Sequence, residues 1–194
     1  MIVKKEIRIL GWDDGPFPKR GKGKAILRGV IFRGASFIDG VLKTEIEIDG
    51  TDATEKIAEA VKKSRHKDLR IIMLDGITFG GFNFVDMKKL YEETKLPVIS
   101  VTRKKTNMRK FKEAMKKLPN FEKRWEAVKN AGKLFEIKVG SRGKSIYFQK
   151  YGLSEEEARE IIKLTAKRSN IPEPIRVAHL IASGVVRGES VGRA

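Results

Sequence analysis

The chain lacks cysteine and is poor in histidine. Its 194 residues include no Cys and two His, His66 and His179. Without cysteine the protein can form neither disulfide bonds nor a thiolate metal site. Two histidines are too few for a histidine-rich zinc site. These absences exclude disulfide-stabilised folds and the common zinc-binding modules.

Long apolar runs are also missing. No run approaches the ~18 residues that a membrane helix needs, and the N-terminal stretch MIVKKEIRIL lacks the apolar region of a signal peptide. Hydrophobic residues make up 40% of the chain, which is typical of a globular protein. We expect a soluble, cytoplasmic protein with a single domain over residues 1–184 and a mobile C-terminal tail over residues 185–194.

Acidic residues are scarce in the centre of the chain. The formal net charge is +17, and residues 87–150 carry 19 Lys and Arg against 6 Asp and Glu. A field of one sign attracts polyanions, most commonly nucleic acid. A heat-adapted surface is the alternative, but its ion-pair networks require acidic partners that this segment lacks. We therefore expect residues 87–150, the basic segment, to bind nucleic acid or another phosphate-rich ligand.

Two apolar stretches end in aspartate. Residues 7–15, IRILGWDDG, end in Asp13 and Asp14, and residues 69–76, LRIIMLDG, end in Asp75. Two core strands that end at one sheet edge would bring these carboxylates together. Adjacent carboxylates repel one another unless solvent, donors or a metal compensates. Carboxylates gathered in this way favour a hard cation, Mg²⁺ or Mn²⁺.

The order of the predicted elements defines a fold class. Alternating apolar patterns predict strands over 6–13, 25–33 and 41–48, with Asp39-Gly40 as a hairpin turn, and a helix follows over 52–65. A strand over 69–75, a helix over 84–94 and a strand over 97–102 then form a parallel β-α-β unit. An antiparallel three-strand meander followed by parallel β-α-β is the order of the ribonuclease H-like fold, an α/β mixed sheet with helices on both faces.

Four motifs resemble a known family over nearly the full chain. They are Gly11-Trp12-Asp13, Leu74-Asp75-Gly76, residues 99–104 (ISVTRK) and residues 172–180 (PEPIRVAHL). On these motifs the chain resembles the domain of unknown function 99 family, UPF0215, which is itself similar to endonuclease V. The resemblance implies an endonuclease V-like domain. It also implies an archaeal source, since that family is largely archaeal.

The resemblance also implies roles for particular residues. Asp13 and Asp75 match the metal-ligand aspartates of endonuclease V, and Asp52 stands where that family has a catalytic glutamate. Arg103 or Lys104 matches its active-site lysine, while Asp14 has no counterpart. Simpler structural roles are open for two of these residues: Asp52 as a helix cap and Asp75 as a turn former.

The chain departs from the endonuclease V pattern in two places. Residues 47–51 contain no strand-separating wedge, and the late histidine of that family aligns near Tyr151. His179 falls on a predicted amphipathic helix, where packing is the favoured interpretation. Specificity for a deaminated base is therefore not carried over from endonuclease V.

These patterns lead to a hypothesis of metal-dependent phosphodiester hydrolysis. Asp13, Asp75 and Asp52 would hold Mg²⁺ or Mn²⁺, with Asp52 and Asp14 also holding water on the metal. Arg103 or Lys104 would offset the charge that develops on the phosphate. The alternative is a catalytically inactive nucleic-acid-binding protein of the same fold, and a small-molecule phosphoesterase is a third possibility. The proposed catalytic set is Asp13, Asp52, Asp75, Asp14, Lys104 and Arg103.

Overall fold

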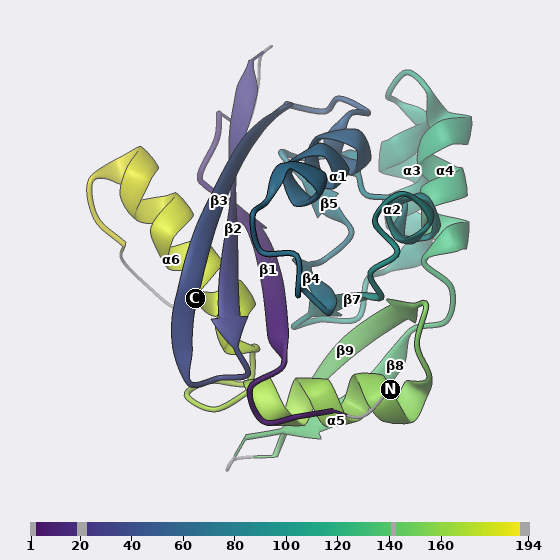
Figure 1. Cartoon of the computed structure of the whole chain (residues 1–194). Helices are drawn as coiled ribbons and strands as arrows, with labels where there is room; N and C mark the ends of the chain where they lie inside the picture. Colours follow the sequence, from purple (N-terminus) through teal and green to yellow (C-terminus); the bar gives the residue numbers. More distant parts are fainter. Residues whose placement is uncertain (1–2, 19–22, 141–142, 191–194) are drawn as a thin grey trace.

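A computed structural model describes residues 3–18, 23–140 and 143–190. In this part of the chain the strands form a seven-stranded sheet with the order β3-β2-β1-β4-β7-β9-β8, and β5 pairs with β6 beside it (Figure 1). The strands are β1 (Arg8–Asp14), β2 (Lys24–Arg33), β3 (Phe37–Glu47), β4 (Ile71–Asp75), β5 (Thr78–Phe79), β6 (Asn83–Phe84), β7 (Val98–Thr102), β8 (Phe135–Val139) and β9 (Lys144–Tyr151).

The pairing of the strands confirms the predicted ribonuclease H-like arrangement. Strands β1, β2 and β3 form an antiparallel meander. Strand β4 joins β1 in parallel, and β7 joins β4 in parallel, so the first and fourth strands lie side by side at the centre of the sheet. The register pairs Trp12 with Leu74. Asp13 and Asp75 therefore follow at the same edge of the sheet.

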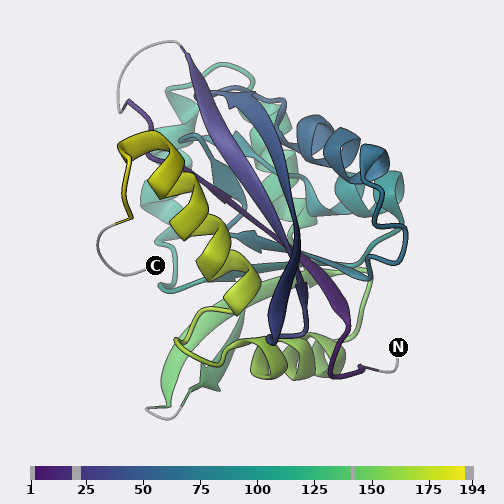
Figure 2. The same ribbon diagram turned by 60° about the vertical axis from the view of Figure 1, so that its left-hand side comes forward.

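Helices cover both faces of the sheet, as predicted. Helices α1 and α2 cover one face, with α3 and α4 packed beside α2, and helices α5 and α6 cover the other face (Figures 1 and 2). The helices are α1 (Ala53–Lys63), α2 (Met87–Thr94), α3 (Met108–Lys116), α4 (Phe121–Asn130), α5 (Glu155–Thr165) and α6 (Glu173–Arg187). None of the described helices is long and apolar enough to cross a membrane.

Strand β1 is buried on both faces, and this explains its continuous apolar sequence. Leu10 and Trp12 pack into the core beneath α1 and α2. Ile9 points the other way and packs in the core that includes Ile161 of α5. Burying one such side chain contributes about 1.5–3 kcal/mol. The site at the end of β1 therefore rests on a rigid support.

Two local predictions are corrected by the structure. The turn between β2 and β3 lies at Gly34–Ser36, so the hairpin predicted at Asp39-Gly40 is wrong. Asp39 lies inside β3, where its carboxylate accepts hydrogen bonds from Arg8 and Arg33. Helix α6 continues through Arg187, so the first residues of the predicted tail, 185–187, are helical. Residues 191–194 of that tail lie outside the described residues.

Candidate functional site

The carboxylates of β1 and β4 meet at one edge of the sheet. Because side chains alternate along a strand, Asp13 and Asp75 point to the same face as Ile9 and Met73, the face that α5 and α6 cover. The side chains of Asp13 and Asp75 interact directly with one another. Asp14 points to the opposite face, where its Oδ2 accepts a hydrogen bond of 2.6 Å from the backbone N–H of Gly80.

A histidine from α6 completes the cluster. His179 Nδ1 lies 2.8 Å from Oδ2 of Asp13, which is almost fully buried. The sequence favoured packing for His179, and the structure corrects that interpretation. The apolar positions Ile175, Ala178 and Ala182 define the buried side of α6. His179 sits on the margin of that side and is the residue that sequence reasoning missed.

Two glycines allow α6 to lie close to β1. A Cβ atom at Gly11 would sit 2.4 Å from the carbonyl carbon of Pro174, and one at Gly15 would sit 2.9 Å from the carbonyl oxygen of Ala182. Figure 2 shows α6 lying across the strands of the meander. Any larger residue at Gly11 would push the helix away. The small residues on either side of Asp13-Asp14 thus bring His179 within reach of Asp13.

The negative charges of the carboxylates in the cluster are only partly balanced by neighbouring positive charges and hydrogen-bond donors. Burial raises the pKa of Asp13 to about 7, repulsion from Asp75 and Asp14 adds to this, and the hydrogen bond with His179 opposes it. Burial also raises the pKa of Asp14 to about 6, against the stabilising N–H of Gly80. The pKa of Asp75 is raised by burial, although the positive charge of Arg103 opposes the rise. A cation at this position would remove the unfavourable repulsion.

The cluster opens into a cavity of about 770 Å³. The polar part of its lining includes five residues predicted from the sequence, together with the newly identified histidine: Asp13, Asp14, Asp75, Arg103, Lys104 and His179. Away from the carboxylates the lining is largely apolar and comes from α3, α4 and the segment before β8. The cavity therefore has a charged end and an apolar end.

Asp52 and Tyr151 lie elsewhere. Asp52 precedes α1, and its Oδ1 accepts hydrogen bonds from the side-chain nitrogen of Asn83 at 2.6 Å and the backbone N–H of Glu47 at 3.2 Å. It makes no side-chain cap bond and is not part of the cavity lining. Tyr151 packs against Tyr91, with the two ring planes tilted by 56°. The structure thus places neither residue with the carboxylate cluster, where the imidazole comes from His179 of α6.

The donor set suits Mg²⁺ better than a metal enclosed by protein ligands. Among the described residues, no group of three His, Asp or Glu side chains is arranged to hold a metal ion. Asp13 and Asp75 nevertheless offer paired carboxylate oxygens at the edge of an open cavity. Mg²⁺ commonly binds through one or two carboxylates and completes its coordination with water and phosphate oxygens. The residues present fit such a cation.

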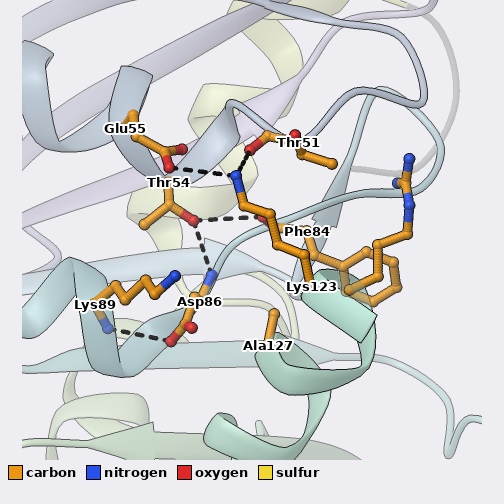
Figure 3. Close-up of a pocket in the computed structure, with 9 residues that line it drawn as sticks. Thr51, Thr54, Glu55, Phe84, Asp86, Lys89, Lys123 and Ala127 are labelled. Atoms are coloured by element: carbon orange, nitrogen blue, oxygen red, sulfur yellow. Dashed lines mark hydrogen bonds and ion pairs between the residues drawn. The ribbon is translucent and has the colours of Figure 1, made fainter. Parts of the chain in front are cut away.

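A second pocket, between α1, α2 and α4, is too small for a substrate. Its volume is about 20 Å³, which is room for about one water molecule. Figure 3 shows its polar groups already paired: the Lys123 ammonium contacts Thr51 and Glu55, and Thr54 bonds the backbone of Phe84 and Asp86. This pocket is a junction that attaches α4 to α1 and α2.

Comparisons with known proteins agree with this geometry and confirm the resemblance found in the sequence. A family model described as endonuclease dU matches residues 5–186. A UPF0215 protein of Methanosarcina mazei is 50% identical over 193 residues, which cover 99% of this chain and 97% of that protein. A crystal structure of an Archaeoglobus fulgidus protein has a TM-score of 0.83 at 40% identity and covers 94% of this chain and 99% of its own.

Endonuclease V of Ciona intestinalis, solved with a 24mer DNA containing an inosine, has a TM-score of 0.57 at 17% identity, over 89% of this chain and 82% of that one. At such low identity the likeness shows a shared fold. The fold is therefore endonuclease V-like, as predicted. Since the family model spans nearly the whole sequence, the chain belongs to the endonuclease dU family.

Proposed function

We propose that this protein is an endonuclease that cleaves DNA at deoxyuridine with the help of Mg²⁺ or Mn²⁺. The observation that carries the proposal is the pair formed by buried Asp13 and partly buried Asp75 at an open cavity, with Asp13 bonded to His179. The family description suggests the substrate. Because uracil is deaminated cytosine, the proposal departs from the sequence-based expectation that specificity for a deaminated base is not carried over. The cavity opens to the surface, as a site for a polymeric substrate requires.

The residues of the cluster have distinct roles in the proposed reaction. Asp13 and Asp75 would hold the cation, which when bound polarises the scissile phosphate and helps to form the attacking hydroxide. His179 orients the Asp13 carboxylate through Nδ1 and can exchange a proton from its other ring nitrogen. Arg103 and Lys104, on the same cavity wall, offset negative charge that develops on the phosphate.

The nucleic acid backbone would lie along the basic segment, residues 87–150. This segment supplies Arg103 and Lys104 to the cavity and carries helices α3 and α4. Each phosphate that a Lys or Arg contacts releases condensed counterions, so DNA affinity should fall steeply as salt concentration rises. The alternative of an inactive nucleic-acid-binding protein rested on a missing histidine and a missing strand-separating wedge, and the position of His179 beside Asp13 weakens the first of these two grounds.

The proposal is tested with DNA duplexes that differ at one nucleotide. Cleavage of a duplex with one deoxyuridine is measured with Mg²⁺, with Mn²⁺ and with EDTA, and is compared with matched duplexes that carry deoxycytidine or deoxyinosine. We expect metal-dependent cleavage at deoxyuridine, lost in Asp13→Asn. Equal cleavage of all duplexes would refute the deoxyuridine assignment, and cleavage that persists in EDTA would refute the metal assignment.

A further inference from the structure

We propose that the apolar end of the cavity receives the base of the target nucleotide and that Gln149 and Ser100 select this base by its hydrogen-bonding edge. This inference rests on the proposed function. Both residues line the same cavity as the carboxylates. They lie on neighbouring strands, β9 and β7, where the antiparallel register pairs them directly.

The walls of this end suit a flat, partly apolar ring. Phe111 of α3, Val128 of α4 and Leu134 line it, and Phe111 is held by ring contacts to Phe82 and Phe84, with centroids 5.6 Å apart in each case. Enzymes that do chemistry on a base extrude it from the duplex and read its edge, and we extend this mode of recognition to backbone cleavage at a particular base. The volume of about 770 Å³ exceeds the needs of the carboxylate cluster alone.

Gln149 presents a defined hydrogen-bonding group. Its Nε2 donates to the backbone carbonyl of Gly132 at 3.0 Å, and Gly132 also lines the cavity. This bond fixes which end of the side-chain amide is the nitrogen. We assign Oε1, rather than the second hydrogen of Nε2, to the ligand, and this oxygen can only accept a hydrogen bond.

Ser100 supplies an independent observation that points to a ligand. Its side chain is almost fully buried, and its hydroxyl has no hydrogen-bond partner among the described residues. Buried polar groups in folded proteins are nearly always paired, because an unpaired one is destabilising. Ser100 is among the residues that line the cavity, and it pairs with Gln149 in the register of β7 and β9. A hydroxyl in this position can donate to a carbonyl oxygen of a bound ring.

With ring atom N3 facing Gln149, this pair of groups matches uracil and not cytosine. Uracil presents an N3–H donor beside carbonyl oxygens, so Oε1 of Gln149 can accept from N3–H while Ser100 donates to a neighbouring carbonyl. Cytosine has a lone pair at N3, which would face Oε1 without a proton between them. Thymine has the same edge as uracil. The two residues therefore separate uracil from cytosine, and the shape of the apolar wall must separate uracil from thymine.

The test pairs a change in the protein with a change in the base. Cleavage efficiency and binding are measured for wild type and Gln149→Ala on duplexes with deoxyuridine, 3-methyldeoxyuridine, deoxycytidine or thymidine. Loss of one good base contact corresponds to about 10–100-fold. Wild type should prefer deoxyuridine to the 3-methyl analogue by that factor. Gln149→Ala should lose this preference and the preference over deoxycytidine, and should keep the preference over thymidine.

Three comparisons keep the result unambiguous. Lys43→Ala, at an exposed position in β3 outside both the cavity and the basic segment, should behave as wild type. Ser100→Ala should weaken the preference for deoxyuridine over deoxycytidine, and thermal melting checks that each variant is folded. If Gln149→Ala retains the wild-type ratios, base selection by Gln149 is refuted while the proposed function stands. If wild type shows no preference for deoxyuridine, the proposed function itself fails, and this inference with it.

Discussion

The two ends of β1 hold their charges in opposite ways. At the first residue, Arg8 forms ion pairs with Asp39 and Asp68. Although desolvation tends to raise the pKa of Asp39, the guanidinium groups of Arg8 and Arg33 hold it below its ordinary value. At the other end, burial raises the pKa of Asp13 to about 7, and its neighbours Asp75 and Asp14 add to the repulsion.

This difference distinguishes carboxylates that are paired with cations inside the protein from carboxylates that are available to bind a ligand. The end at Arg8 needs no further cation, because each carboxylate there already has a cationic partner. The second end gathers carboxylates against their mutual repulsion, with one histidine as the directly bonded partner of Asp13. Perturbed pKa values of this kind cluster at functional sites. The predictions below test whether the two ends differ in this way.

The largest effect is expected for catalysis. In Asp75→Asn, cleavage of deoxyuridine DNA should fall by about 10³-fold, because several kcal/mol of charge stabilisation by the metal are lost and each tenfold corresponds to about 1.4 kcal/mol. Mg²⁺ binding by calorimetry should also disappear. Asp68→Asn, at the other end of the strand, is the control and should retain activity. Equal activity of the two variants would remove the distinction between the ends.

A smaller effect is expected for the histidine. His179→Gln removes the imidazole that orients Asp13, and groups that orient metal ligands typically contribute about 10–100-fold. We expect a loss of cleavage in that range, with DNA affinity unchanged because the basic segment is intact. The readouts are single-turnover cleavage and fluorescence anisotropy. An unchanged cleavage rate would show that the Asp13–His179 contact has no part in the reaction.

The next prediction is that substitutions at the two ends of β1 shift the melting temperature in opposite directions. Removing a charge at the uncompensated end, in Asp75→Asn, should raise the melting temperature of the metal-free protein, because like-charge repulsion is relieved. Removing a charge at the paired end, in Asp39→Asn, should lower it, because Arg8 and Arg33 lose their partner. Each kcal/mol corresponds to about 2–4 °C for a chain of this size. Melting curves in EDTA measure the shift for each variant. Shifts of the same sign would show that the two ends of β1 do not differ in their charge balance.

The smallest effect is a pH dependence. The folded state holds a proton on Asp13 up to about pH 7, whereas a free aspartate releases it near 3.8, so the free energy of unfolding should fall as pH rises between these values. The hydrogen bond with Asp13 raises the pKa of His179, and this contribution is likewise lost as pH rises. Urea denaturation in EDTA at a series of pH values measures the trend. Saturating Mg²⁺ should flatten it.

The sequence predicted the parts of the site that strand topology controls. Asp13 and Asp75 each follow an apolar run, and parallel neighbouring strands end at the same edge of a sheet. Their convergence could therefore be deduced once the order of elements was known. Arg103 and Lys104 were predicted from the resemblance to endonuclease V, and they directly follow β7.

The parts that depend on distant packing were not predicted. His179 is 166 residues from Asp13 in sequence, and a histidine on the margin of an amphipathic helix looks the same whether it packs or meets a carboxylate. The dipeptide Asp39-Gly40 has the chemistry of a turn, but the pairing of Asp39 with Arg8 keeps it inside a strand. Asp52 was placed by resemblance, and its side chain is instead bound to Asn83.

The close packing of α6 against Gly11 and Gly15 has a consequence during synthesis of the protein. A chain still on the ribosome, or truncated before residue 173, already contains every carboxylate of the cluster but not the histidine, and the helix that shields Asp13 is absent. Such a fragment would carry an incomplete site beside the basic segment. If the proposed function holds, competence to cut DNA would thus arise only after the last helix has docked.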